Sequence, residues 1–216
     1  MIPGTQGYAE QAAELILRYE SVPFEHKYRA ERHLLPAVPS RILDVGAGTG
    51  ADAAWLAARS HTVLAVEPTA ALRVAGQARH PHPTIEWLDD SLPELARVRH
   101  RRQQFDVLML TAVWMHLDLA ERARAMPTLA ALLAPRGLLL LSLRHGPVPA
   151  QRRMFEVSGA ETVALAQSHG LECVLQMAAE SSQAVNRAAG VHWTRLAFRW
   201  PGVAPQAPPK NLILKT

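Results

Sequence analysis

The chain has 216 residues, of which 49% are hydrophobic and 19% charged, and its formal net charge is +4. A chain of this length is most simply one domain, which buries about 70% of the surface of its unfolded state. Cys173 is the only cysteine, so an internal disulfide and a cysteine-rich zinc site are excluded. No run approaches the ~18 apolar residues that a membrane span needs, and residues 1–4 lack the features of a secretory signal. We therefore expect a soluble cytoplasmic protein without a membrane partner.

The first 39 residues predict an N-terminal helical cap, with helices over residues 8–19 and 24–35 that end before Pro36 and Pro39. From residue 40 to residue 200, short apolar runs alternate with helical patterns. The predicted strands are 41–45, 62–66, 84–88, 105–110, 138–143, 171–177 and 191–200. The predicted helices are 51–59, 69–79, 119–133 and 158–169. This alternation is typical of an α/β fold with a doubly wound, mostly parallel sheet and helices on both faces.

Three further segments complete this prediction. Residues 97–102 contain a cluster of arginines, which we interpret as a solvated loop. Residues 178–190 are polar and show no helical pattern, so we expect the seventh strand to run antiparallel to the others. Residues 201–216 contain four prolines and predict an extended C-terminal tail. The chain is thus expected to be a single domain over 1–200, followed by this tail.

The most informative segment is the glycine-rich turn after the first strand. Gly46, Gly48 and Gly50 alternate with Ala47 and Thr49, and a predicted helix starts at residue 51. Glycines at such a turn let a ligand approach the backbone, and the helix start offers unpaired N–H groups. Dinucleotide enzymes carry G-x-G-x-x-G instead, so the spacing favours another nucleotide-like ligand.

Together with Asp44, two residues before Gly46, this turn resembles the first motif of class I S-adenosylmethionine-dependent methyltransferases. The resemblance extends over residues 40–200 and implies a Rossmann-like sheet of seven strands with the last antiparallel. It implies S-adenosyl-L-methionine as the cofactor, with Asp44 near its methionine end. An alternative for Asp44 is a structural acceptor that orders the glycine turn. Glu67, followed by Pro68 at the end of the second strand, is expected to accept hydrogen bonds from the ribose diol.

The third and fourth strands supply the expected adenine site. The third strand ends at Asp89, Asp90 and Ser91, where the family holds the adenine amino group. The spacing favours Asp90, and we expect one of the two acids to be only a solvated charge or a helix cap. After the fourth strand, Ala112 and Val113 are expected to cover the adenine ring. The turn over 132–137 also resembles the family, although Arg136 replaces a glycine there.

Candidate catalytic residues follow the fourth and fifth strands. His116 is the best candidate for a general base, because neutral histidine accepts a proton near pH 7. Arg144 is a candidate for binding a carboxylate or phosphate of the substrate, and His145 is a second candidate base. For each of the three, a structural hydrogen bond or ion pair is the competing interpretation.

The motifs that the sequence lacks narrow the chemical class of the methyl acceptor. The sequence has no Asn/Asp-Pro-Pro-aromatic motif, no Pro-Cys pair and no set of metal ligands. We therefore expect a small-molecule acceptor and no metal, while the basic charge leaves a nucleic-acid substrate open but not favoured. A nicotinamide-dependent oxidoreductase and a non-catalytic S-adenosylmethionine-binding regulator stay open as alternatives. Neither the acceptor atom nor an oligomeric state is predicted.

Overall fold

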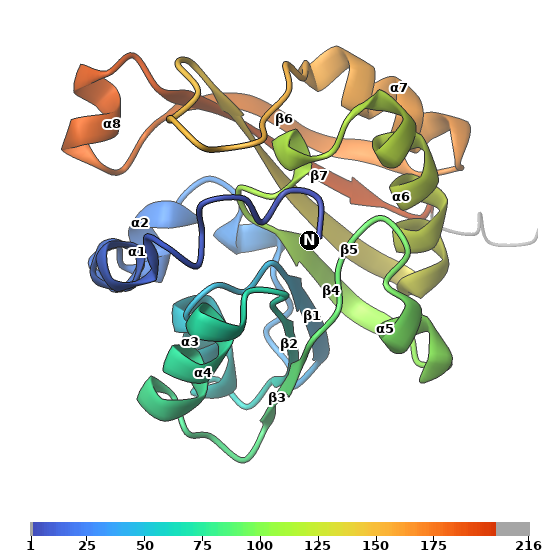
Figure 1. The fold of residues 1–216 in the computed structure, drawn as a ribbon. Coiled ribbons are helices and arrows are strands. Elements are labelled where there is room, and N and C mark those ends of the chain that lie inside the picture. Colours follow the sequence, from blue (N-terminus) through green and yellow to red (C-terminus); the bar gives the residue numbers. More distant parts are fainter. Residues whose placement is uncertain (1, 202–216) are drawn as a thin grey trace, which may run out of the picture.

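The computed structural model describes residues 2–201, which form one seven-stranded sheet covered by helices (Figure 1). The strand order is β3-β2-β1-β4-β5-β7-β6. The strands are β1 (Arg41–Val45), β2 (Thr62–Val66), β3 (Ile85–Leu88), β4 (Phe105–Leu110), β5 (Leu133–His145), β6 (Glu172–Glu180) and β7 (His192–Arg199). The helices are α1 (Ala12–Glu20), α2 (Phe24–Lys27), α3 (Ala51–Ala57), α4 (Ala70–Arg79), α5 (Ala96–His100), α6 (Leu119–Leu132), α7 (Gly159–Ser168) and α8 (Ala184–Ala188), with the 3-10 turns η1 (Arg32–Leu34) and η2 (Trp114–His116).

The topology confirms the predicted Rossmann-like sheet. Strands β1 to β5 pair in parallel, whereas β7 pairs antiparallel with both β5 and β6. The strand order reverses between β1 and β4, and ligands of doubly wound sheets bind at this point, beyond the carboxyl ends of the strands.

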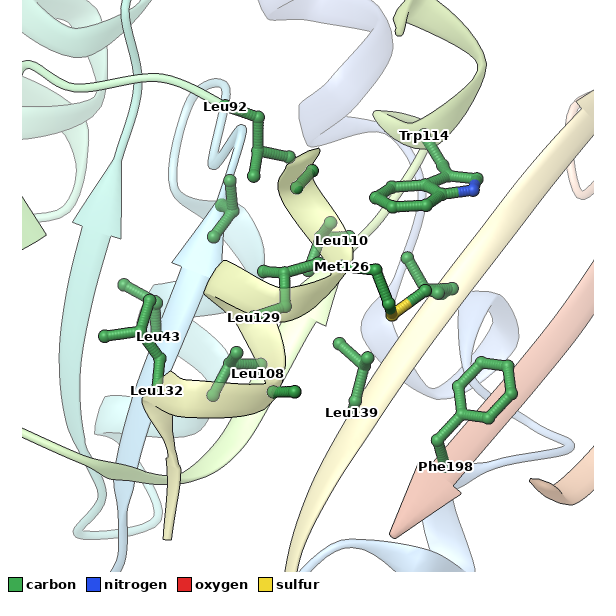
Figure 2. Close-up of a cluster of buried hydrophobic side chains, with 14 of the residues drawn as sticks. Leu43, Leu92, Leu108, Leu110, Trp114, Met126, Leu129, Leu132, Leu139 and Phe198 are labelled. Carbon is green, nitrogen blue, oxygen red and sulfur yellow. The ribbon is translucent and has the colours of Figure 1, made fainter. Parts of the chain in front are cut away.

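Alternate residues of the central strands point into two hydrophobic layers on opposite faces of the sheet. On one face, Leu43 and Leu108 pack with α6 residues such as Met126 and Leu129 (Figure 2). On the other face, Ile42 and Val107 pack with residues of α2 and α3, including Leu56. Because both faces are covered, the central strands are mostly apolar, and the apolar runs in the sequence were a reliable signal of them.

The N-terminal segment is less helical than predicted. The first helix begins at Ala12 and not at residue 8. The second predicted helix, 24–35, is a four-residue α2 followed by turns and η1. The chain turns here so that Tyr28, whose side chain is buried, packs its ring against Phe24, with 4.2 Å between the ring centroids. Figure 1 shows this segment, in blue, beside the carboxyl ends of β1 and β4.

Other boundaries also differ from the predictions. The arginine cluster 97–102 begins as α5, not as a loop, because Asp90 accepts hydrogen bonds from the N–H groups of Arg97 and Val98. The polar connection 178–190 contains the short helix α8, and β6 extends to Glu180. Strand β5 begins at Leu133, five residues earlier than expected. The predicted tail lies, apart from Pro201, outside the described residues, and no helix of residues 2–201 is long and apolar enough to cross a membrane.

A glycine inside α4 fixes the distance between this helix and the glycine turn. A Cβ at Gly76 would lie 2.7 Å from the carbonyl oxygen of Thr49 and 2.3 Å from the Trp87 ring. Only a residue without a side chain lets the helix come this close.

We therefore expect Gly76→Ala to destabilise the protein by about 1–3 kcal/mol through overpacking. In an unconstrained helix the same change would stabilise by up to about 1 kcal/mol. Urea unfolding of the variant measures the difference. Ala75→Gly, at the neighbouring position of α4, serves as the control for helix propensity alone. A Gly76→Ala protein as stable as the wild type would contradict the close packing.

Candidate active site

A cavity of about 280 Å³ lies at the carboxyl edge of the sheet. Residues that follow β1, β2, β3, β4 and β5 line it, and the N-terminal segment from Pro3 to Tyr8 closes one side. Most of the predicted site residues line this cavity: Asp44, Gly46, Ala47, Gly48, Glu67, Pro68, Asp90, Ser91, Ala112, Val113, His116 and Arg144. Gly50, Asp89 and His145 do not.

The glycine turn has the conformation that its sequence suggested. Gly46, Gly48 and Gly50 all have positive φ, at 72°, 58° and 77°, a region where side chains cause strain. A Cβ at Gly46 would lie 2.5 Å from Val113, and one at Gly50 would lie 2.6 Å from Trp87. Gly50 therefore serves the packing of the turn on β3 and α4, while Gly46 and Gly48 face the cavity.

Glu67 connects the turn to the second strand. Its carboxylate accepts hydrogen bonds from the backbone N–H of Gly48 (2.9 Å) and of Thr69 (2.7 Å). Burial raises the pKa of Glu67, and the two backbone N–H donors oppose that rise. A carboxylate oxygen has more than one lone pair, so each oxygen of Glu67 still has acceptor capacity toward the cavity.

Asp44 lies under the same turn and is almost fully buried. Its Oδ2 has no hydrogen-bond partner among the described residues. Desolvation, with the nearby charges of Asp52 and Glu67, raises the pKa of Asp44 to about 8, and Lys27 opposes this. A buried carboxyl group without a partner is costly, so Asp44 marks a place where a donor or a cation from a ligand would be stabilised.

Lys27 is already bound to another acid. Its Nζ lies 2.7 Å from Oδ1 of Asp52 at the start of α3, and the Tyr28 hydroxyl donates to the same carboxylate. The hydroxyls of Tyr28 and Thr111 are also hydrogen-bonded, which joins α2 to the end of β4. The sequence analysis missed this network, since Asp52 lies 25 residues beyond Lys27 and 24 beyond Tyr28 along the chain.

The two acids after β3 have different environments. Asp90 lines the cavity, but its carboxylate accepts backbone N–H bonds from Ser91, Arg97 and Val98. Asp89 lies outside the cavity and pairs with Arg73 at 3.0 Å. Asp90 is therefore the helix cap, and it is also the acid that lies beside the expected adenine position.

His116 forms a pair with Tyr8 from the N-terminal segment. The Tyr8 hydroxyl lies 2.9 Å from Nε2 of His116, and Nδ1 lies 2.7 Å from the carbonyl oxygen of Arg153. Because a carbonyl only accepts, Nδ1 carries the hydrogen and Nε2 accepts from Tyr8 when the ring is neutral. Burial lowers the pKa of His116, with help from Arg152, Arg153 and Arg144. The ring is thus neutral at pH 7.

The side chains of Arg144 and His145, at the end of β5, point in different directions. Arg144 points into the cavity, and its only hydrogen bond among the described residues is a long one, 3.5 Å, to the carbonyl oxygen of Gly146. His145 lies away from the cavity, bonded to Thr194 (2.8 Å) and stacked on His192. Successive strand residues point to opposite faces, so this pair can contribute only one member to the cavity.

Arg152 is a cavity residue that is not among the predicted site residues. Its guanidinium lies over the Tyr8 ring, 4.1 Å from the centroid, and donates to Gln6 and Gln11. It therefore fixes the N-terminal segment across the cavity. Sequence alone gives no signal for a contact between residues 6–11 and residue 152.

The comparisons with known proteins agree with this geometry. Residues 19–205 match the family model described as "Methyltransferase domain". The chain belongs to the methyltransferase domain family. Comparison with curated proteins finds no match for this methyltransferase.

Several solved structures resemble this methyltransferase. The 1,6-didemethyltoxoflavin-N1-methyltransferase of Burkholderia thailandensis is 20% identical with a TM-score of 0.68, over 89% of this chain and 85% of that one. A TehB-like methyltransferase from Corynebacterium glutamicum is 18% identical with a TM-score of 0.62, over 90% of this chain and 98% of that one. The N-methyltransferase NodS of Bradyrhizobium japonicum is 15% identical with a TM-score of 0.61, over 88% of this chain and 99% of that one. At these identities the likeness shows the fold alone.

Proposed function

We propose that this methyltransferase moves a methyl group from S-adenosylmethionine to a small-molecule acceptor, with the cofactor along the glycine turn. The observation that carries the proposal is the buried carboxyl of Asp44, whose Oδ2 has no partner among residues 2–201 although it lines the cavity. A ligand with a cationic group at this point satisfies it. Solved relatives of the same fold bind S-adenosylmethionine or S-adenosylhomocysteine, among them the toxoflavin enzyme and NodS.

The residues around the cavity fit the parts of this cofactor. Asp44 would hold the amino group, and Glu67 would accept from the ribose hydroxyls while it orders Gly48. Asp90 and Ser91 would face the adenine, with Ala112 and Val113 over its ring. Gly46, Ala47 and Gly48 line the cavity, so the ligand would lie against their backbone.

S-Adenosylmethionine supplies an activated methyl group, so the protein mainly aligns the acceptor and excludes water. Where the acceptor must lose a proton, Tyr8 and His116 are placed to receive it. The Tyr8 oxygen accepts the proton, and the Tyr8 hydroxyl passes its own to Nε2 of His116. The Arg153 carbonyl keeps Nε2 free of hydrogen by holding the other tautomer.

Calorimetry tests the cofactor assignment. We expect S-adenosylmethionine and S-adenosylhomocysteine to bind and NAD not to bind. Glu67→Ala is expected to weaken binding by about 1.5–3 kcal/mol, the scale of hydrogen bonds to a charged group. Glu86→Ala, an exposed acid on β3 that pairs with Arg101, is the matched control. Binding of NAD alone, or a near-wild-type dissociation constant for Glu67→Ala, would overturn the assignment.

A labelled-methyl assay against a metabolite extract separates an enzyme from a non-catalytic cofactor-binding regulator. Transfer to a small molecule is expected, and transfer to RNA or DNA is not. The small acceptor is favoured because the cavity is about 280 Å³ and is closed on one side by residues 3–8. We further propose a cytoplasmic reaction, since the chain carries a single cysteine and no disulfide framework. Cell fractionation tests the location.

A further inference from the structure

Charges divide the cavity into two parts. The acidic residues that line it lie at or beyond the ends of β1, β2 and β3: Asp44, Asp52, Glu67 and Asp90. The arginines 144 and 195 come from β5 and β7 on the other side of the strand-order reversal, and Arg152 follows β5. The acidic part suits a cationic cofactor, which leaves the arginine-lined part for the second substrate.

The cations of the cavity differ in whether a carboxylate already neutralises them. Lys27 is paired with Asp52, Arg195 lies 3.4 Å from Glu31, and Arg18 of α1 lies 4.0 Å from Glu14. Arg144 and Arg152 form no salt bridge within residues 2–201, and Arg152 uses its donors on Gln6 and Gln11. Arg144 is half-buried and bonds only to a carbonyl at 3.5 Å. Among the guanidinium groups of the cavity, it is the one that has neither a salt bridge nor a hydrogen bond shorter than 3.5 Å within residues 2–201.

The surroundings of Arg144 also suit an organic acid. In the antiparallel pair of β5 and β7, Arg144 lies opposite Trp193, so the two side chains share one face of the sheet. Met115 and Met154 line the cavity as well. Burial and the charge of Arg18 lower the pKa of Arg144, so a bound anion would relieve repulsion between neighbouring cations.

We propose that Arg144, assisted by Arg152, binds an oxyanion of the methyl acceptor, so that the acceptor is a small organic acid with a carboxylate or phosphate group. The inference rests on the proposed function, since it assigns the acidic part of the cavity to the cofactor. Guanidinium binds such groups through two parallel hydrogen bonds. The apolar part of the acid packs against Trp193 and the two methionines, and its reacting atom faces Tyr8.

The test uses the full-length protein saturated with S-adenosylhomocysteine and titrated with matched probes. Salicylate is compared with salicylamide, which has the same shape without the charge, and phenyl phosphate replaces the carboxylate by a phosphate. We expect salicylate or phenyl phosphate to bind at least about tenfold more tightly than salicylamide, a difference typical of one charge-assisted bond. The tighter of the two acids identifies the oxyanion.

Arg144→Gln is expected to remove this preference while S-adenosylhomocysteine binds as before. Arg99→Gln, an exposed arginine of α5, removes the same charge away from the cavity and should change nothing. Equal binding of acid and amide, binding of none of the probes, or an intact preference in Arg144→Gln would overturn the proposal. Weaker S-adenosylhomocysteine binding in Arg144→Gln would also overturn it, because the arginine would then serve the cofactor. Failure of the wild type to bind S-adenosylhomocysteine would instead overturn the proposed function.

Discussion

His116→Ala is expected to lower kcat by about 10²–10³-fold for an acceptor that must lose a proton. Nε2 of His116 is the only strong acceptor that contacts the Tyr8 hydroxyl among the described hydrogen bonds. Without it, a proton taken up by Tyr8 has no base to receive it. The pKa of Tyr8 is raised far above its usual value by burial, so the phenol cannot serve as a base by ionising.

The pH profile separates a proton acceptor from a merely structural histidine. The base must be neutral, and burial lowers the pKa of His116 below its ordinary value of 6.5. Activity is therefore expected to be full at pH 7 and to fall as the pH drops through the lowered pKa, below 6.5. His116→Ala and Tyr8→Phe should both lose this acidic limb, and their effects should not add, since they interrupt one path.

His82→Ala is the matched control, because His82 is exposed and lies outside the cavity. Unchanged turnover in His116→Ala, or an acidic limb that persists in it, would remove the pair from the mechanism. Tyr8→Phe keeps the ring under Arg152, so it tests the hydroxyl without loosening the N-terminal segment.

Asp44→Asn is expected to have two opposite effects, weaker cofactor binding and a more stable free protein. The variant cannot form the buried ion pair with the cofactor's amino group, a loss of about 3–5 kcal/mol. At pH 7 the carboxyl of the wild type, whose pKa is about 8, must first lose its proton, which costs about 1.4 kcal/mol. The net loss is about 2–4 kcal/mol, or roughly 30- to 700-fold in affinity.

The stability effect depends on pH with a definite sign. The pKa of Asp44 is raised from 3.8 in the unfolded chain to about 8 in the fold. The contribution of protonated Asp44 to the free energy of unfolding is therefore fully present below pH 4. It is lost progressively as the pH rises toward 8. Asp44→Asn lacks this loss, so at pH 7 to 8 it should be more stable than the wild type by up to about 4–5 kcal/mol, or up to about 8–20 °C in Tm. Below pH 4 the two should agree.

Proton release on cofactor binding gives a third readout for Asp44. If the cofactor's cation ionises this carboxyl, binding at pH 7 releases about one proton. Calorimetry in buffers of different ionisation enthalpy should detect this release in the wild type and not in Asp44→Asn. Asp106→Asn, a partly exposed acid at the start of β4, is the control for charge. Equal proton release in wild type and variant would contradict the assignment.

The sequence predicted the sheet because buried parallel strands are continuous apolar runs, and it predicted the glycine turn because backbone with positive φ favours glycine. It failed where long-range contacts decide the local structure. Residues 24–35 have helical composition, yet the chain turns so that Tyr28 and Lys27 reach Asp52. Likewise, α5 forms at the arginine cluster because Asp90 caps it.

The candidate site shows the same division. Asp44, Glu67 and Asp90 were predicted because each lies at or just beyond the end of a strand, and strand ends meet at one edge of the sheet. Tyr8 and Arg152 were not among the predicted site residues, because their roles arise from contacts across more than 100 residues. The separation of Arg144 from His145 follows from strand alternation, and it could have been predicted once the extent of β5 was known.

The position of Gly4 has a practical consequence. A Cβ there would lie 3.0 Å from the Cβ of His116, and Pro3, Gly4 and Thr5 line the cavity. We expect an affinity tag joined ahead of these residues to lie close to the cavity, to compete with the acceptor and to perturb His116. Kinetic constants should therefore be measured on protein purified through a tag at the other end.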